Sequence, residues 1–237
     1  MLGEPILRLD ETDSTNRVAL DWQDAPHGAC VVARSQSGGR GRLGRSWESA
    51  ADLGLYLSLV LRVEGANAPL YSLWSALGVA RALEKLSGAS FRVKWPNDVL
   101  CVAQSGQARK IGGILCEGRG EILVVGIGVN VNHGADELPT RPIFPAASLR
   151  LETGRVFEID AVSAAVLGEL NAVFAQNGDD LHAEFARRCF GLGEVVSVKS
   201  ATESLVGVFE GVESDGALLL RTADGLKRIL AGDVSYF

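Results

Sequence analysis

The chain has 237 residues, of which 47% are hydrophobic and 22% charged, a balance typical of a globular protein able to bury a full-sized core. Its net charge of -6 argues against a protein whose whole surface binds nucleic acid, because such proteins carry a basic domain or stripe. The longest strongly apolar run, at 122–129, is much shorter than the roughly 20 residues that span a bilayer, and the first residues lack the pattern of a signal peptide. We therefore expect a cytoplasmic protein that binds neither nucleic acid nor membrane.

The first 190 residues show a mixture of strand and helix patterns. Leucines alternate along 55–62, which predicts a strand with one apolar face, whereas apolar residues at three- and four-residue steps along 70–87 predict a helix that faces a sheet. The same reasoning predicts strands at 29–34, 91–95, 110–117 and 121–131 and helices at 160–176 and 179–188. We therefore expect a mixed α/β domain over residues 1–190.

The C-terminal stretch, 191–237, differs from the first 190 residues in its sequence pattern. From Glu194 onward, short β-rich runs are interrupted by Ser-Asp-Gly at 214–216 and Ala-Asp-Gly at 223–225, which are turn signals. These signals predict hairpins that close a small β-barrel of about five strands, a number that follows from typical strand lengths. We place the boundary between the two domains near Gly191.

The four cysteines are widely scattered and form no C-x-x-C pair. Zinc sites and disulfide frameworks normally show closely or regularly spaced cysteines, so neither is expected here. We interpret all four as buried thiols, at Cys30, Cys101, Cys116 and Cys189.

Segment 34–48 packs four arginines and four glycines into fifteen residues of an otherwise acidic protein. Glycines let backbone N–H groups approach a ligand closely, and guanidinium groups match the oxygens of a carboxylate or phosphate. The segment therefore predicts a loop that binds an anion and closes over it as a lid. An exposed basic loop that contacts RNA or an acidic partner remains the alternative. The segment is not a Walker A loop, because G-x-x-x-x-G-K-[ST] is absent.

The alternation of side chains along 122–131 indicates a second ligand-facing surface. On one face, two glycines leave space next to a polar amide; the residues of this face are Ile122, Val124, Gly126, Gly128 and Asn130. Lys110 and Gly112 are expected to share a face in the same way. Glycine weakens the interior of a strand, so this pattern favours the close approach of a ligand. A β-bulge or tight interstrand packing is the alternative.

The segment FRVKWPNDVL, at 91–100, predicts a strand that ends at Pro96, followed by a turn at Asn97 and Asp98 after which the chain pairs back. The alternation puts Lys94 and Phe91 on opposite faces of the strand, with Lys94 on the ligand-facing side. Asp98 is near enough in sequence to hold the ammonium group of Lys94. A simple hairpin corner is the alternative interpretation.

A helical run at 17–22 follows the segment Asp-Ser-Thr-Asn at 13–16. Asp13 or Ser14 is suited to cap this helix, and the segment alone favours that role. A helix start also supplies backbone amides that bind an anion, so a ligand-binding role stays open.

Five motifs, in this order and spacing, resemble the biotin protein ligase family from near Leu9 to the C-terminus. They are DSTN at 13–16, QSGGRGRLGRSW at 36–47, KWPND at 94–98, KIGGILCE at 110–117 and GIGVN at 126–130. The resemblance implies an α+β catalytic domain with a mixed β-sheet, related to class II aminoacyl-tRNA synthetases, and a C-terminal domain like a small SH3 barrel. Many bacterial relatives carry an N-terminal helix-turn-helix that this sequence does not show, so repressor activity is not expected.

The same resemblance implies a set of site residues. Biotin would contact Ser14, Thr15, Asn16, Gln36, Arg40, Gly41, Arg42 and Lys110. ATP would contact Arg40, Arg42, Arg45, Trp47, Lys94, Asn97 and Asn130, with Trp47 stacking on adenine. Lys110 and Arg42 would be the catalytic residues, and Asp98 would bind magnesium or orient Lys94.

The activity implied by the resemblance has two steps. Biotin would react with ATP in the presence of Mg²⁺ to form biotinyl-5′-AMP, and the biotinyl group would pass to a lysine of a biotin carboxyl carrier protein or domain. A lipoate or octanoate ligase and a non-catalytic biotin-sensing module are the alternatives, because fold alone does not separate them. The sequence does not identify the acceptor, and it leaves a homodimer open.

Overall fold

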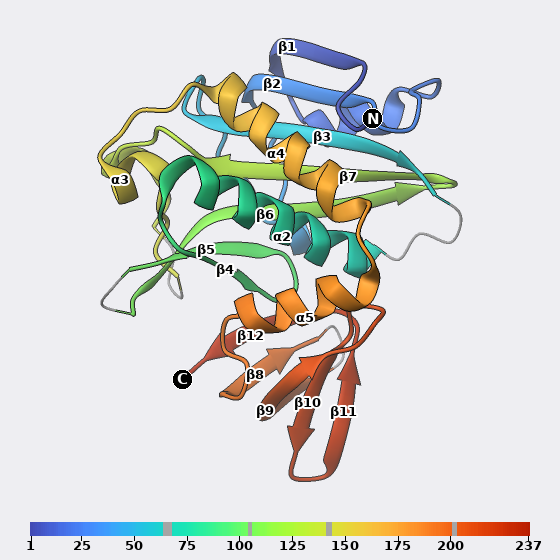
Figure 1. Cartoon of the computed structure of the whole chain (residues 1–237), viewed down its shortest axis with the longest axis vertical. Helices are drawn as coiled ribbons and strands as arrows, with labels where there is room; N and C mark the ends of the chain where they lie inside the picture. The colour runs from blue at the N-terminus through green and yellow to red at the C-terminus, as the bar shows by residue number, and fades with distance from the viewer. Residues whose placement is uncertain (64–67, 104–105, 141–143, 201–202) are drawn as a thin grey trace.

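The computed structural model describes residues 1–63, 68–103, 106–140, 144–200 and 203–237. A seven-stranded mixed sheet forms the larger part, with β1 and β2 parallel and the other neighbours antiparallel (Figure 1). In sheet order its strands are β1 (Ile6–Thr12), β2 (Cys30–Gln36), β3 (Gly54–Arg62), β7 (Ile122–Asn130), β6 (Ala108–Arg119), β5 (Asp98–Val102) and β4 (Phe91–Lys94). The predicted mixed sheet is therefore confirmed.

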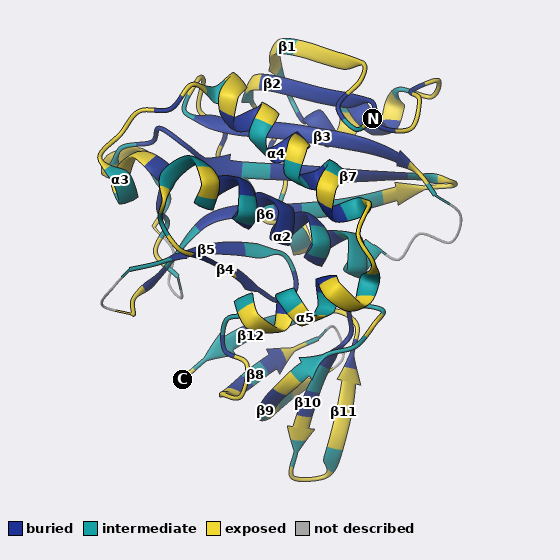
Figure 2. Ribbon diagram, viewed as in Figure 1, coloured by how far each residue is buried: buried dark blue, intermediate teal, exposed yellow. Residues whose placement is uncertain are grey.

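Helices cover both faces of this sheet. Helices α2 (Ala68–Ser87) and α4 (Ile159–Phe174) pack together on one face, where the alternating leucines of β3 meet them (Figure 1). Helix α1 (Thr15–Asp21) packs on the opposite face, against Val60 of β3 and its neighbours. Because both faces are covered, the central strands are buried along most of their length (Figure 2).

The two remaining helices lie after the sheet in sequence. They are α3 (Leu149–Thr153) and α5 (Gly178–Arg188), and short 3-10 turns occur at Arg42–Gly44 and Ala135–Glu137. The sequence did not predict α3, because five residues are too few to show a helical period. It also did not predict β1, an edge strand whose residues are mostly exposed and therefore lack a clear apolar alternation.

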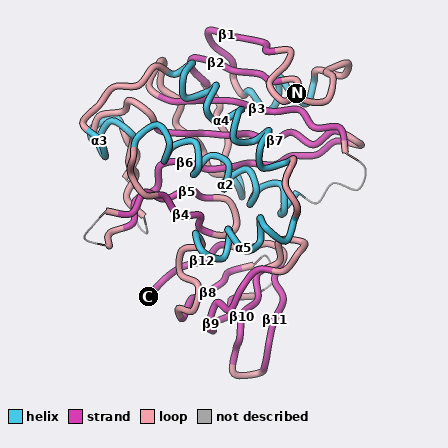
Figure 3. Tube along the Cα trace, viewed as in Figure 1, coloured by secondary structure: helices cyan, strands magenta, loops and turns pink. Residues whose placement is uncertain are grey.

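The C-terminal domain is a sheet of five antiparallel strands in the order β11-β10-β9-β8-β12 (Figure 3). Its strands are β8 (Val195–Lys199), β9 (Ser204–Val212), β10 (Leu218–Thr222), β11 (Gly225–Ile229) and β12 (Asp233–Tyr236). Five strands were predicted, and both predicted turns join neighbouring strands. The predicted closure of these strands into a barrel is wrong, because β11 and β12 form the two edges of the sheet and do not pair with each other. Turn signals act locally and do not determine how edge strands pair.

Buried contacts fix the C-terminal domain against the catalytic domain. The indole Nε1 of Trp95 donates a hydrogen bond of 2.9 Å to the carbonyl of Gly216, and the Trp95 side chain is fully buried. Phe144, Phe190 and Tyr236 form an edge-to-face cluster with centroid distances of 5.1 to 5.7 Å. Aromatic clusters of this kind bury large areas with defined geometry, so β12 has a fixed position next to the catalytic domain.

Candidate functional site

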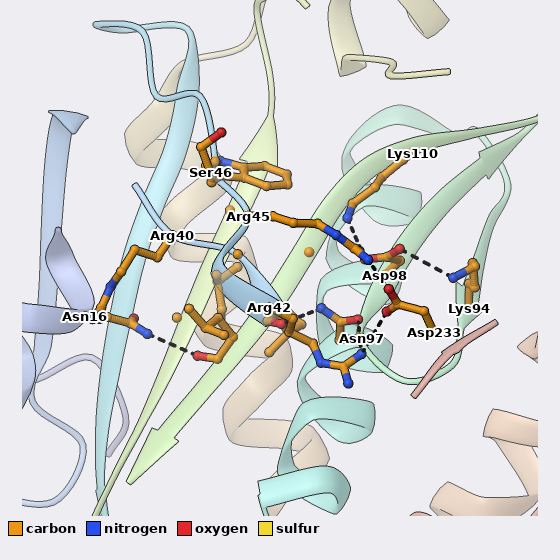
Figure 4. A pocket seen from close by; sticks show the side chains of 18 of the residues that line it. Asn16, Arg40, Arg42, Arg45, Ser46, Lys94, Asn97, Asp98, Lys110 and Asp233 are labelled. Atoms are coloured by element: carbon orange, nitrogen blue, oxygen red, sulfur yellow. Dashed lines mark hydrogen bonds and ion pairs between the residues drawn. The ribbon is translucent and has the colours of Figure 1, made fainter. Parts of the chain in front are cut away.

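A cavity of about 430 Å³ lies between the catalytic domain and β12. Its walls come from the start of α1, from β6 and β7, and from the segment 37–46, which we call the arginine loop (Figure 4). The cavity brings together nearly all the predicted site residues: Ser14, Thr15, Asn16, Gln36, Arg40, Gly41, Arg42, Arg45, Trp47, Lys94, Asn97, Asp98 and Lys110. Asn130 alone among the predicted site residues does not line it.

One end of the cavity carries buried, uncharged polar groups at the start of α1. The backbone N–H and the hydroxyl of Thr15 both donate to Oε1 of Gln36, at 2.8 and 3.1 Å. Ser58 Oγ lies 2.8 Å from Thr15 Oγ1 and 2.6 Å from Asn16 Oδ1. These groups orient one another in a low-dielectric setting, so their positions are fixed before any ligand arrives.

Ser14 is the N-cap residue of α1, but its side chain makes no capping hydrogen bond. The predicted capping role is therefore only partly correct: Ser14 has the extended N-cap backbone, and Asp13 Oδ1 accepts the N–H of Ser14 at 2.7 Å. Ser14 lines the cavity, and its hydroxyl is not used to cap the helix.

Two glycines of β7 make room for this polar end, as the alternation predicted. A Cβ at Gly126 would lie within 3.0 Å of the Asn16 amide, and a Cβ at Gly128 would lie within 3.0 Å of the Trp47 indole. Larger residues at either position would displace the side chain opposite. The glycines on this face therefore allow two side chains that line the cavity to pack closely against the strand, whereas the close approach of a ligand stays a prediction.

The predicted pairing of Lys110 with Gly112 on one face is wrong. The register between β5 and β6 shifts at this point, so Val99 is opposite Gly112 while Leu100 is opposite Lys110. A β-bulge was the alternative interpretation of this segment. Its extra residue reverses which face of the sheet the side chains beyond it occupy. The Lys110 side chain consequently lies next to Gly113, where an ideal Cβ would be 3.5 Å from Nζ.

The other end of the cavity is charged and is centred on Asp98. Its Oδ1 lies 2.6 Å from Nζ of Lys110 and its Oδ2 lies 3.7 Å from Nζ of Lys94. Burial lowers the pKa of Lys94, and Asp98 opposes this effect. Burial alone would raise the pKa of Asp98, but the two ammonium groups bring it below its ordinary value. Asp98 therefore favours the charged form of Lys94 and forms a close ion pair with Lys110.

The arginine loop connects the catalytic domain to β12. Arg42 Nη1 donates to the carbonyl of Gly232 at 3.2 Å and lies 3.8 Å from Oδ1 of Asp233. Arg45 also pairs with Asp233 (Figure 4). Arg40 Nη2 contacts Glu117 Oε2 at 2.9 Å. The guanidinium groups of the loop are thus directed into the cavity and held by carboxylates from two domains.

Trp47 covers the middle of the cavity. Its ring lies against Gly128, with Nζ of Lys110 5.6 Å from a ring centroid, within cation–π range. The indole Nε1 is buried and has no hydrogen-bond partner in the described parts of the chain. Asn130 lies behind this ring, donates to the carbonyl of Ala147 at 3.0 Å, and lines a smaller adjoining cavity that Trp47 and Lys110 also line.

Six polar residues at the site were not assigned a role from the sequence: Ser46, Ser58, Glu117, Lys199, Asp233 and Ser235. Ser58 had a detectable signal, because it is a polar residue on the face of β3 opposite the leucines. Glu117 lies inside a recognised motif and could have been assigned. Asp233 and Lys199 lie in the C-terminal domain, and no local pattern indicates that this domain reaches the cavity.

The cysteines take no part in the cavity lining. All four are free thiols; Cys30, Cys101 and Cys189 are buried as predicted, whereas Cys116 is only partly buried. Burial raises the pKa of each thiol to about 12. Such thiols remain protonated at neutral pH, so they are poor nucleophiles and poor metal ligands.

The described residues contain no helix long and apolar enough to cross a membrane. They also contain no group of three or more His, Cys, Asp or Glu side chains arranged to hold a metal ion. Asp98, one predicted magnesium ligand, directs its two oxygens toward Lys110 and Lys94. Its geometry therefore fits the alternative prediction, in which it orients Lys94.

Two family models match this chain. The biotin/lipoate A/B protein ligase family matches residues 8–132, and the biotin protein ligase C terminal domain matches residues 191–236. The chain is 33% identical to the biotin--[acetyl-CoA-carboxylase] ligase of Paracoccus denitrificans, over 96% of this chain and 99% of that protein. It is 30% identical to the bifunctional ligase/repressor BirA of Bacillus spizizenii, over 99% of this chain and 74% of that protein.

A solved structure gives a matching result. The biotin protein ligase from Aquifex aeolicus, determined in complex with biotin and ATP, superposes with a TM-score of 0.85 and 32% sequence identity. The match covers 98% of both chains. The similarity therefore extends across both domains and includes the arrangement of the C-terminal sheet beside the cavity.

Proposed function

The chain belongs to the biotin protein ligase family, and from this premise we propose that it activates biotin with ATP and attaches it to a lysine of a carrier protein. One observation carries the proposal: a single cavity joins a buried neutral end to an end with several cations. Biotin has the same division, with an uncharged ureido ring at one end and a carboxylate at the other.

The description of the N-terminal family model includes lipoate ligases as well as biotin ligases. Two findings favour biotin. The C-terminal model is specific to biotin protein ligases, and the full-length relative from Paracoccus denitrificans is named as a biotin ligase. Lipoate has a disulfide ring without hydrogen-bonding groups, so it could not form the hydrogen bonds that the polar groups at the start of α1 can offer to a ureido ring.

In our proposal the ureido ring lies against Ser14, Thr15, Asn16 and Gln36. Amide and hydroxyl groups can both donate and accept, which suits a ring that presents two N–H groups and a carbonyl. The close packing of Asn16 against Gly126 leaves little freedom for the amide, so recognition is rigid. The valeryl chain then extends along the cavity toward the charged end.

In the first step, a carboxylate oxygen of biotin attacks the α-phosphorus of ATP. An O–P bond forms, the bond to the β-phosphate oxygen breaks, and pyrophosphate leaves with its electrons. Lys110 and Arg42 would offset the repulsion between the two anions, each contributing about 3 kcal/mol of barrier lowering if well placed. Asp98 supports this step by holding Lys110 in position, 2.6 Å away.

We assign the nucleoside to the region of Trp47, Asn97 and Asn130, with adenine stacked on the indole ring. The position of Trp47 and Asn97 supports this assignment, because both line the main cavity together with the basic residues of the charged end. Arg40, Arg45 and Lys94 would contribute positive charge to the nucleotide site. Gly41 would let the backbone of the loop approach the carboxylate closely.

Magnesium enters our proposal as part of the MgATP substrate. The protein side chains do not fit a dedicated magnesium site, because Asp98 is neutralised by two lysines and Asp233 is held by two arginines. Mg²⁺ retains water readily and is commonly bound through substrate phosphates. No step of the mechanism is assigned to a metal held by the protein.

In the second step, the neutral amine of an acceptor lysine attacks the acyl carbon of biotinyl-5′-AMP. The amide C–N bond forms, the bond from the acyl carbon to the phosphate oxygen breaks, AMP leaves, and the amine proton passes to solvent or phosphate. The mixed anhydride hydrolyses readily in water, so the arginine loop has to exclude solvent until the acceptor arrives.

We further propose that the acceptor is a biotin carboxyl carrier protein or domain of a biotin-dependent carboxylase, and that the reaction takes place in the cytoplasm. The name of the Paracoccus denitrificans relative, which identifies acetyl-CoA carboxylase, supports this acceptor class. ATP and the carboxylase are both available in that compartment.

The proposal is tested by incubating the protein with MgATP, labelled biotin and a biotin carboxyl carrier domain, followed by peptide mass spectrometry. We expect one carrier lysine to gain biotin, with release of AMP and pyrophosphate. A matched carrier variant with that lysine replaced by arginine should remain unlabelled. Absence of label on the unaltered carrier, under conditions where a biotin ligase control modifies it, would overturn the proposal.

A further inference from the structure

Lys199 brings a positive charge from the C-terminal domain to the cavity. It is the last residue of β8, its side chain is exposed, and it is part of the cavity lining. In the antiparallel pair of β8 and β12, Lys199 lies directly opposite Asp233. Residues opposite each other in such a pair direct their side chains to the same face, so Lys199 lies beside the carboxylate that holds the arginine loop.

Six basic side chains line the cavity: Arg40, Arg42, Arg45, Lys94, Lys110 and Lys199. The first five each have a carboxylate within 4.0 Å, supplied by Glu117, Asp98 or Asp233. Lys199 has no ion pair with any residue in the described ranges. It therefore differs from the other five in having a charge that no neighbouring carboxylate neutralises.

The position of Lys199 along the cavity limits which part of a ligand it can reach. Figure 4 shows Asn16 and Arg40 on one side of the cavity and Asp98 and Asp233 on the other. Arg42 donates to the carbonyl of Gly232, and a Cβ at Gly232 would lie 3.0 Å from the carbonyl of Lys199. Lys199 thus lies beyond Arg42, on the side away from the neutral end.

The geometry of phosphoryl transfer identifies the group expected there. The attacking and leaving oxygens are roughly in line across the phosphorus atom. If the biotin carboxylate approaches from the neutral end and the α-phosphate lies between Lys110 and Arg42, pyrophosphate leaves toward β12. Asp233 would repel it if unpaired, but Arg42 and Arg45 neutralise that carboxylate.

We propose that Lys199 binds the β- and γ-phosphates of ATP and, after the first step, the leaving pyrophosphate. This inference rests on the proposed function, because it assumes adenylate formation in this cavity. It gives the C-terminal domain a direct contact with the substrate in the first step. Lys199 has no role in the second step, because pyrophosphate has left before the acceptor lysine attacks.

The experiment compares Lys199→Gln with the unaltered protein and with Lys227→Gln. Lys227 is an exposed lysine on β11 of the same sheet and lies outside the cavity lining, so it is a matched control. Two reactions are measured: biotin-dependent exchange between ATP and labelled pyrophosphate, and transfer from preformed biotinyl-5′-AMP to a carrier domain. Lys199→Arg, which retains the charge, serves as the rescue variant.

For Lys199→Gln we expect the KM for ATP and the KM for pyrophosphate to rise about fivefold, as is usual for loss of an accessible charge-assisted contact. The KM for biotin and the rate of transfer from biotinyl-5′-AMP should be unchanged. Lys199→Arg should restore most of the affinity for ATP, and Lys227→Gln should match the unaltered protein.

Each alternative outcome has a separate meaning. If the unaltered protein catalyses exchange but Lys199→Gln leaves both KM values unchanged, the inference about Lys199 is wrong. An equal loss in exchange and in transfer would also overturn it, because that result would assign Lys199 to the carrier or to domain stability. If the unaltered protein forms no adenylate from biotin, the proposed function itself fails.

Discussion

The two ends of the cavity are built in different ways. The neutral end comes entirely from the catalytic domain, and its polar groups, such as Thr15 and Asn16, are buried and hydrogen-bonded to one another. The charged end combines strands β4 to β6 with the arginine loop and the C-terminal domain, and its contacts are ion pairs, several of them partly exposed. The neutral end is therefore fixed by hydrogen bonds within one domain, whereas the charged end depends on contacts between two domains.

This difference follows from the physics of each task. A neutral ring is bound by matched hydrogen bonds, which lose strength if the partners are free to move. Transfer of a phosphoryl group between anions needs several cations close together, and these repel one another unless carboxylates such as Asp98 and Asp233 separate them. In the charged end, these two carboxylates offset that repulsion before any substrate binds.

Lys110→Ala is the strongest test of the difference between the neutral and charged ends of the cavity. We expect the rate of adenylate formation to fall about 10²- to 10³-fold, because a positive donor at the reacting oxygens is lost. Biotin affinity should change by less than about threefold, since the neutral end supplies most of the binding. Pyrophosphate exchange measures the first quantity and calorimetry the second.

Lys85→Ala is the control for this variant, because Lys85 forms an exposed ion pair with Glu169 on the helical face of the sheet. It should leave both quantities unchanged. Equal losses of rate and biotin affinity in Lys110→Ala would assign Lys110 to ordinary substrate binding, and the two ends would no longer have separate tasks.

Gly126→Ala tests the neutral end. The new methyl group would lie within 3.0 Å of the Asn16 amide and would displace it, so biotin affinity should fall about tenfold or more. ATP affinity should be retained. Gly118→Ala, where the nearest atom to the new Cβ is 3.7 Å away, is the control. Unchanged biotin binding in Gly126→Ala would show that Asn16 does not contact the ligand.

Arg42→Gly tests whether the charged end retains the intermediate. The variant loses the contacts to Asn97 and Gly232 that join the loop to both domains. We expect biotinyl-5′-AMP to escape, so that the ratio of label on bystander proteins to label on the carrier rises about tenfold. Mass spectrometry of a mixed-protein reaction measures that ratio. Normal adenylate formation with label confined to the carrier lysine would contradict the prediction.

The smallest expected effect concerns the arginine loop itself. Its ion pairs are partly exposed and each is worth at most about 1 kcal/mol, so opening of the free loop should be easy. Biotin or biotinyl-5′-AMP should slow amide hydrogen exchange of residues 37–46 by about threefold or more. Equal protection with and without ligand would show that the loop does not act as a lid.

Much of the neutral end could be predicted because its determinants are local. Period-two alternation placed Gly126 and Gly128 on the ligand-facing side of β7, and the Asp-Ser-Thr-Asn segment placed polar groups at a helix start. The strands and long helices of the catalytic domain likewise follow from apolar periodicity, since both faces of the sheet are covered.

The charged end was harder to predict because it depends on tertiary contacts. The bulge in β6 moved Lys110 next to Gly113, and alternation alone has no means to detect an inserted residue. Asp233 and Lys199 reach the cavity only because the C-terminal sheet docks beside it. The closure of that sheet was also mispredicted, since turn residues specify hairpins but not the pairing of distant edges.

The central claim is that the neutral end selects biotin while the charged end activates its carboxylate. Biotin and lipoate both carry a carboxylate on an aliphatic chain and differ mainly at the ring, so a comparison of the two isolates the neutral end. The direct measurement is ATP–pyrophosphate exchange with each acid as the only substrate. We predict exchange with biotin and at least about a hundredfold lower kcat/KM with lipoate, because the lipoate ring cannot form hydrogen bonds with the polar groups of the neutral end. Equal exchange with both acids, or exchange with lipoate alone, would contradict the account.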